Sequence, residues 1–575
     1  MSKLYIALKI SFSFIASVYS LLTYAQEQSI HIRISKNIEA LHPLISHSLT
    51  DNSIAKHIFY PLLDIEPKTH TYTPILLKAL PAVVDGGRAK IYEIRENATW
   101  SDGKPVTAKD VIFTLKAALC PNLPTSKWRD NIKMIDNFEI DINNVKVFKI
   151  TINNPAFTLT GIPIYPEHIY DKQNLLKDYT INQISKIKSK NIPSDITKFQ
   201  QQFISPEMKK IAIGSGPYKV KEWINNNILV LERLTNWWGS GLDNSKEAFN
   251  INAKELHYEI MSDLAMTTVA FKLQQLDIWY DIPAKEFNDL QKLDSNYYHF
   301  ALRKVPTLSY EYIAINNKPK DENKKFLTEP FVRKGIAHAI DVQTMQKQVL
   351  KGYGCRIACP SVPQKKSSYS KEIPFVEYNP QEAKKYLALS GWLDTNNDGI
   401  LDQLINGSLT NLKLTILVNK EDSYDRKIAH FIIKDLQNVG VEIESEEVDS
   451  ETELLRLQEG NYDLAIVSYH DKPGPANPRP LWHSQGIQNV TAFSNEQVDV
   501  LIEKIEKSKD VNEKEKLFLE FNTIWAKEQP AILLWQKEML IAISEKYKDY
   551  KFSMAFDSYV GFNPSSFFIG GDAKR

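Results

Sequence analysis

Oxygen-bearing side chains between residues 394 and 402 are spaced like the ligands of a calcium-binding loop. Such a loop takes ligands from positions 1, 3, 5 and 9, and here these positions hold Asp394, Asn396, Asp398 and Asp402. Position 12 normally supplies a bidentate glutamate, but this chain has Ile405 there. The stretch is therefore either a calcium site or, as we expect, an acidic surface turn.

Two of the three cysteines, Cys355 and Cys359, lie four positions apart between a glycine and a proline. In an oxidising compartment this pair could form a disulfide that pins the loop. A structural zinc site needs about four ligands, and no further cysteine or histidine lies near them in sequence. We therefore predict a disulfide rather than a metal site, and Cys120 is expected to be a small buried hydrophobic residue.

Asp471 lies just beyond a predicted strand, two residues after Tyr469. Crevices in α/β proteins form outside the carboxyl ends of parallel strands, so this carboxylate is placed where a ligand would bind. The alternative is a solvated loop carboxylate, and the residues alone leave both interpretations open.

Motifs of common enzymes are absent from the sequence. There is no His-Glu-x-x-His and no Gly-x-Ser-x-Gly, and the glycine-rich residues 213–218 lack the Lys-Ser/Thr ending of a phosphate-binding loop. We therefore predict no catalytic residues and no cofactor. A secreted hydrolase that uses a pair of carboxylates remains the alternative from another functional class, because sequence does not place such a pair.

The elements that must position Asp471 form an alternating series. Residues 412–418, 441–445 and 462–467 are predicted strands, and residues 423–438 and 451–458 are predicted helices. The order strand–helix–strand–helix–strand is typical of a parallel sheet covered by helices. Asp471 would lie just beyond the third strand.

A second unit of this kind is predicted nearer the N-terminus. Residues 31–35 alternate and indicate a first strand. Residues 257–261 and 276–280 are predicted strands that flank a helix, which begins after Asp263 and extends to Gln275. Because a helix connects these two strands, we expect them to be parallel.

Residues 91–119 predict a strand, a tight turn and a helix in succession. Tyr92 and Ile94 alternate with charged residues, as in a half-buried strand. Thr107 with Asp110 three residues later resembles a capping box and predicts the start of the helix.

Composition describes an ordinary globular protein of two or three domains. The chain has 575 residues, of which 43% are hydrophobic and 24% are charged. Seventy basic residues balance seventy acidic residues, which argues against a nucleic-acid partner.

The N-terminus has the pattern of a secretory signal peptide. Lys3 and Lys9 precede an apolar run at residues 10–22, and the small residue Ala25 closes the segment. The run is shorter than the roughly 20 residues that span a bilayer, although retention as a membrane anchor remains the alternative. We expect residues 1–25 to be cleaved during export to the periplasm.

The string from Trp100 to Thr114 reads Trp-Ser-Asp-Gly-Lys-Pro-Val-Thr-Ala-Lys-Asp-Val-Ile-Phe-Thr. It resembles the signature of the extracellular solute-binding proteins of family 5, the peptide-binding components of bacterial ABC importers. Further landmarks follow in the family's order: the glycine-rich 213–218, Trp237-Trp238-Gly239 and the predicted helix 331–341. In that helix Gly335 replaces an alanine that is usual in the family.

The resemblance implies a periplasmic binding protein-like α/β fold of type II. Two α/β lobes would enclose a cleft, and the first lobe would carry an extra subdomain. We expect a first lobe at 26–300 with residues 65–205 inserted as this subdomain. The second lobe would span 301–535, and residues 536–575 would return to the first lobe.

The resemblance also implies a function and a set of site residues. The protein would capture a solute, most simply a peptide, and deliver it as a monomer to the membrane subunits of an ABC transporter. In peptide-binding members an aspartate that matches Asp471 receives the peptide's α-ammonium, although the prolines after Asp471 depart from the family pattern. Tyr469 and Trp482 are candidate walls, and Trp238 and Asn316 are further candidate ligand-binding residues. Nickel, haem or an oligosaccharide are alternative ligands in this family.

Overall fold

The computed structural model describes residues 29–548 and 568–569, with gaps at 47, 67–70, 126–127, 130–131, 154–156, 189, 294, 406, 472–474 and 509. The predicted signal peptide, residues 1–25, lies outside the described residues. Among those that are described, no helix combines the length and the apolar character needed to cross a membrane.

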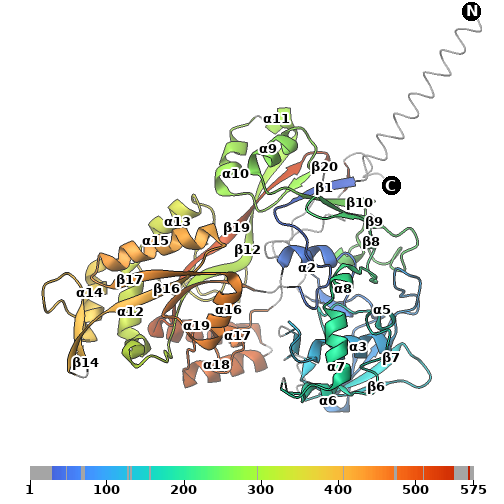
Figure 1. The fold of residues 1–575 in the computed structure, drawn as a ribbon, viewed down its shortest axis with the longest axis horizontal. Coiled ribbons are helices and arrows are strands. Elements are labelled where there is room, and N and C mark those ends of the chain that lie inside the picture. Colours follow the sequence, from blue (N-terminus) through green and yellow to red (C-terminus); the bar gives the residue numbers. More distant parts are fainter. Residues whose placement is uncertain are drawn as a thin grey trace, which may run out of the picture.

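One mixed sheet of eleven strands extends across both lobes (Figure 1). Ten of its strands follow one another in the order β17 (Glu442–Val448), β16 (Lys413–Asn419), β18 (Leu464–His470), β12 (Phe300–Ile315), β19 (Ala531–Ser544), β11 (Ile278–Trp279), β1 (Ser29–Ile34), β10 (Glu255–Ile260), β9 (Ile228–Arg233) and β8 (Tyr218–Ile224). The remaining strand, β13 (Cys355–Arg356), pairs with β19 beside this path.

The part of the sheet from β17 to β19 is the centre of the second lobe. As expected, β16, β17 and β18 are parallel, and α15 (Ser423–Gln437) and α16 (Ser450–Glu459) connect them. Strand β12 is buried on both faces because Ile313 and Ile315 join one hydrophobic core while Tyr312 and Ala314 join another.

Each face of this sheet is covered by its own helices. One core includes residues of α15 and of three further helices, α12 (Pro330–Ala339), α13 (Val342–Val349) and α14 (Pro380–Leu389). The opposite core includes residues of α16 and of α17 (Arg479–Trp482), α18 (Glu496–Lys507) and α19 (Val511–Glu528). This packing explains why Gly335 replaces the alanine that is usual in the family. A Cβ at residue 335 would lie 2.7 Å from Leu387 Cγ, so α12 and α14 approach this closely only because the residue is glycine.

Strands β12 and β19 form the connection between the lobes (Figure 1). They are antiparallel to each other, and β19 continues past the second lobe to pair with β11 in the first. The register between them shifts between Pro306 and Tyr310, where Thr307 Oγ1 donates to the backbone oxygen of Lys537 at 3.0 Å. The expected return to the first lobe at residue 536 therefore falls inside a continuous strand.

The rest of the sheet belongs to the first lobe. Strand β1 lies between β10 and β11 and is parallel to both, so the two strands of the predicted strand–helix–strand unit are parallel, as expected. The helix between them, α9 (Leu264–Lys272), is capped by Asp263, whose side chain accepts from Met266 N at 2.8 Å. Further helices beside it are α10 (Ala284–Gln291) and α11 (Ser295–Tyr298).

A separate antiparallel sheet forms within the first lobe, in the order β4 (Ala82–Val84), β5 (Ala89–Glu93), β7 (Val147–Ile152) and β6 (Ile135–Ile140). The helices of this region are α3 (Ala108–Leu119), α5 (Glu167–Tyr170), α6 (Ile181–Ser185), α7 (Ser194–Phe203) and α8 (Pro206–Lys210). The predicted strand–turn–helix is β5 followed by α3, and Asp110 accepts from Thr107 N at 2.8 Å at the start of that helix.

The remaining elements are short. They are α2 (Leu49–Ala55), β2 (Leu63–Ile65), β3 (Tyr72–Pro74), η1 (Asp85–Gly87), η2 (Glu247–Phe249), η3 (Glu322–Thr328), β14 (Asp402–Ile405), β15 (Ser408–Asn411), β20 (Tyr547–Lys548) and β21 (Phe568–Ile569).

Candidate functional site

The carboxyl ends of β16, β17 and β18 form one edge of the second lobe, and this edge points toward the first lobe. Because these strands are parallel, they end together at Asn419, Val448 and His470. Strand β12 runs antiparallel to β18 and arrives from the first lobe at the same edge, where Ser309 is paired with His470. We name this the carboxyl edge, and it lies where α/β folds bind ligands.

Asp471 follows β18 directly at the carboxyl edge and forms an ion pair with Lys365. Its Oδ2 lies 2.6 Å from the Lys365 ammonium, and the two side chains are 16% and 6% exposed. Tyr469, two residues earlier on β18, packs its ring 5.3 Å from that of Tyr310 on β12. The predicted ammonium acceptor is thus a carboxylate that already accepts from a cation of the same chain, beside a pair of tyrosines.

A second group of charges lies along the same edge. Glu311 on β12 forms an ion pair with Lys537 on β19, and it also accepts from the Trp535 indole. Burial opposes ionisation of Lys537, but the ion pair with Glu311 outweighs it and raises the pKa of the ammonium. Asp281 of the first lobe also acts on Lys537, which agrees with an edge that faces that lobe.

Asp425 belongs to this second group. Burial raises the pKa of its carboxyl to about 8, and Asp422, Glu311 and Glu453 act in the same direction while Lys537 opposes them. Asp425 lies in the first turn of α15, and Glu453 lies in the first turn of α16. The crowding of carboxyl groups in this group is thus partly relieved by a proton on Asp425, and a bound cation would relieve it in the same way.

The other predicted ligand-binding residues lie in packed positions. Trp482 is buried in α17 between the rings of Tyr312 and Trp525, at 5.8 and 5.2 Å. Asn316 is buried at the end of β12, and its amide donates to the backbone oxygens of residues 460 and 462. Trp482 therefore packs against Tyr312, whose ring lies next to that of Tyr310. Asn316 binds the backbone of the turn that precedes β18.

Trp238 lies in the first lobe, away from the carboxyl edge. Its indole nitrogen donates to the backbone oxygen of Ser215 at 2.6 Å, and the ring is almost fully buried in the core. Beside it, a pocket of about 590 Å³ is lined by Trp237, Phe249 and Arg233. Because residues of one lobe alone line this pocket, we place the candidate site at the carboxyl edge instead.

The two cysteines of the predicted disulfide are separate thiols in the structure. Cys355 is in β13, where its Sγ lies 3.3 Å from Gln536 Oε1, while the Sγ of Cys359 lies 4.0 Å from the backbone oxygen of Ser370. The thiols therefore contact different neighbours, because pairing of β13 with β19 directs Cys355 toward that strand.

The calcium-like loop is folded as a surface turn. Asp394 accepts from the backbone nitrogens of residues 398 and 399, and Asp398 accepts from that of Ile400. Asp402 is buried and accepts from Thr395. These carboxylates thus accept hydrogen bonds from within the loop, as aspartates in turns commonly do.

Sequence reasoning missed the partners that give the carboxyl edge its character. Lys365 is located in the segment between β13 and α14, and no motif marks it. Glu311 and Lys537 are on strands far apart in sequence, and they pair because β12 and β19 lie side by side. One signal in the sequence could have found two of them. Glu311 and Lys537 are charged residues within otherwise apolar strands, which indicates a buried ion pair.

Comparison with known proteins identifies the fold and the family. The chain is 26% identical over 491 residues to the oligopeptide-binding protein AppA of Bacillus subtilis (83% of this chain, 80% of the relative). The solved structure of that protein with a nonapeptide covers 94% of this chain and 98% of its own, with 21% identity and a TM-score of 0.72. NikZ of Campylobacter jejuni, solved with Ni(L-His), is similar in fold at 18% identity and a TM-score of 0.68, over 94% of this chain and 99% of its own. The expected binding-protein fold of two α/β lobes is thereby confirmed.

The family model for bacterial extracellular solute-binding proteins, family 5, matches residues 71–489. This match covers most of the chain, and it includes β12, β16, β17, β18 and Asp471. The chain therefore belongs to the bacterial extracellular solute-binding proteins of family 5.

Proposed function

We propose that this protein captures a peptide in the periplasm and delivers it to the membrane subunits of an ABC importer. The observation that carries the proposal is the carboxylate of Asp471 at the carboxyl edge, next to Tyr469 and Tyr310. A peptide binder of the same family and fold, crystallised with a nonapeptide, supports the ligand class. In this proposal the protein acts as a monomer and without catalysis.

Asp471 would receive the α-ammonium of the peptide while it keeps its bond to Lys365. A carboxylate offers about four acceptor positions, so one oxygen pair serves two cationic donors. Charge-assisted hydrogen bonds of this kind are about twice as strong as neutral ones. Lys365 would orient the carboxylate and, because it is itself positive, would weaken the attraction for the ligand's ammonium.

The role of Tyr469 would be to form a wall of the site together with Tyr310. Aromatic rings beside a carboxylate suit an ammonium group that is followed by an apolar side chain, since the ring face also attracts cations. Trp482 would act indirectly by packing behind Tyr312.

Calorimetry on two peptides and four proteins tests the proposal. The peptides are a free-amine peptide and its N-acetylated form, and the proteins are wild type, Asp471→Asn, Lys365→Met and the double variant. Asp471→Asn should weaken the free-amine peptide by about 2 kcal/mol, at the lower end of the loss for removing a buried charge partner. The N-acetylated peptide should bind all four proteins with similar, weak affinity.

The double variant is the matched control for a damaged fold, because it removes both charges of the pair together. If Asp471→Asn weakens both peptides equally, or neither, Asp471 is not the ammonium partner. Native mass spectrometry of protein taken from the periplasm identifies the ligand directly. A nickel complex, haem or oligosaccharide found there would contradict the peptide assignment, and enzyme-dependent peptide cleavage would favour a hydrolase.

A further inference from the structure

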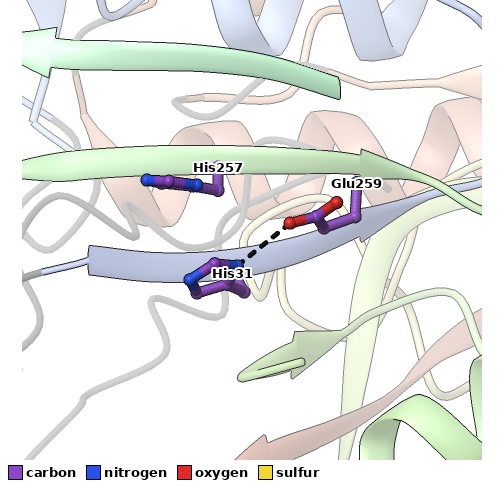
Figure 2. Close-up of side chains that lie close together, drawn as sticks. All are labelled: His31, His257 and Glu259. Carbon is purple, nitrogen blue, oxygen red and sulfur yellow. Dashed lines mark hydrogen bonds and ion pairs between the residues drawn. The ribbon is translucent and has the colours of Figure 1, made fainter. Parts of the chain in front are cut away.

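His31, His257 and Glu259 form a cluster on the sheet of the first lobe, apart from the carboxyl edge (Figure 2). One ligand atom from each residue lies within 4.8 Å of the others, and within the described part of the chain this is the group with metal-binding composition and spacing. The His31 and His257 ring centroids are 4.5 Å apart, and His31 Nδ1 lies 3.0 Å from Glu259 Oε1.

Strand register explains why these residues meet. Strands β1 and β10 are parallel neighbours, and His31 is the direct partner of His257 while Arg33 is the partner of Glu259. Alternate residues of a strand point to the same face, so His257 and Glu259 are both on the face that His31 shares. The neighbouring residues Ile30, Ile32 and Tyr258 point to the opposite face and are buried in the core.

Solvent reaches all three side chains. His31, Glu259 and His257 are 31%, 21% and 18% exposed, so an ion could enter without a rearrangement of the backbone. The carboxylate is already within 3.0 Å of the His31 nitrogen, which is close to the separation of two ligands on one small ion.

A second carboxylate fixes the orientation of His257. Glu255 Oε2 lies 2.8 Å from His257 Nε2, and the other oxygen of Glu255 accepts from the Lys221 ammonium at 2.6 Å. A histidine that donates from Nε2 to a carboxylate carries its lone pair on Nδ1. Carboxylates commonly hold metal-binding histidines in this way, by fixing the tautomer and making the ring a better ligand.

We propose that His31, His257 and Glu259 bind a divalent transition-metal ion of the zinc and nickel class, with Glu255 as a positioning residue. Two imidazoles and one carboxylate are ligands that suit these ions, whereas calcium and magnesium prefer oxygen alone. Three protein ligands leave a fourth position for water. The ion takes the place of the Nδ1 proton that His31 donates to Glu259, and exchange with water moves that proton to Nε2 of the same ring. The ion then joins β1 to β10 across 228 residues of sequence.

Zinc titration of the tag-free, full mature chain tests this site, with a chromophoric chelator as competitor. His31→Gln and His257→Gln should each weaken zinc binding by at least about tenfold, and Glu255→Gln by about tenfold, the range for loss of an outer carboxylate. His430→Gln is the matched control, because His430 is exposed on α15 outside the cluster, and it should bind zinc like wild type. Zinc should raise the melting temperature of wild type but not of His257→Gln.

Three results would overturn the proposal. The first is unchanged zinc affinity in both His31→Gln and His257→Gln. The second is an equal loss in His430→Gln, which indicates unspecific surface binding. The third is zinc binding that is lost in Asp471→Asn but kept in His31→Gln, which places the ion at the carboxyl edge as a transported solute. Circular dichroism of each metal-free variant confirms that it is folded, and Glu259→Gln provides an independent test of the same site.

Discussion

Two carboxylates of this protein, Asp471 and Glu259, each lie against a nitrogen of the same chain, but the partners differ in kind. Asp471 is paired with Lys365, a lysine whose side chain is almost fully buried. Glu259 is paired with His31, an imidazole that can give up its proton, and both side chains are reached by solvent. A cationic ligand at Asp471 would therefore bind beside Lys365. A metal ion at Glu259 would instead take the place of the proton on His31.

The largest difference between the two pairs should appear in stability. Asp471→Asn leaves the Lys365 ammonium buried without its carboxylate and should lower the free energy of unfolding by about 3 kcal/mol, the order found when one partner of a buried ion pair is removed. Lys365→Met should cost a similar amount. Urea denaturation of the single and double variants measures the coupling between them.

The double variant decides this prediction. Removing both charges should cost clearly less than the sum of the two single changes, because the attraction between Lys365 and Asp471 is then lost once and not counted in both. Additive losses would mean that the pair does not act as a unit, and the contrast with Glu259 would disappear.

The free energy of unfolding should depend on pH through Asp425 at the carboxyl edge, which is a second difference from the histidine cluster. Burial, together with Asp422, Glu311 and Glu453, raises the pKa of Asp425 to about 8, well above its value in the unfolded chain. The folded state therefore holds this proton longer, and stability falls as pH rises from about 4 to about 8. Asp425→Asn should raise the free energy of unfolding by about 2 kcal/mol above pH 8, since one pKa unit corresponds to ~1.4 kcal/mol and solvent reaches part of the side chain.

Chemical denaturation of Asp425→Asn and wild type at pH 4, 6, 8 and 9 measures this effect. The two proteins should agree most closely at pH 4 and diverge as pH rises. A constant difference at every pH would show that Asp425 ionises as it does in the unfolded chain.

The smallest effect is expected at His31 in metal-free protein. His31→Gln removes a partly exposed contact with Glu259, and such contacts contribute about 0 to 1 kcal/mol because water solvates the carboxylate that remains. Denaturation in the presence of EDTA measures it. A loss comparable to that of Asp471→Asn would mean that the His31 pair is as structurally important as the buried one.

Local patterns in the sequence were sufficient to predict most elements of the fold. The strands predicted at 412–418, 441–445 and 462–467, with the amphipathic helix at 423–438, gave the parallel unit that ends at Asp471. Asp263 and Thr107 predicted the starts of their helices. These predictions succeed because strand alternation, helical periodicity and capping depend on residues that are near one another in the chain.

Asp471 was found by its position after a strand, but its partner Lys365 was not. Neither member of the pairs Glu311–Lys537 and His31–His257 was found from the sequence, because the two residues of each pair are hundreds of residues apart. Strand order and register bring the two residues of each of these pairs together. Local sequence periodicity does not predict strand order or register.

The sequence by itself therefore determined the family, the alternating α/β elements and the place of Asp471 beyond β18. The tertiary structure alone decided which charges meet: Lys365 at Asp471, and His31 with His257 at Glu259. The physical reason is that Coulomb and hydrogen-bond energies depend on distances and burial across the sheet. The pairing of β1 with β10 sets the distances within the histidine cluster, and the packing of the segment between β13 and α14 against the carboxyl edge sets the distance between Lys365 and Asp471.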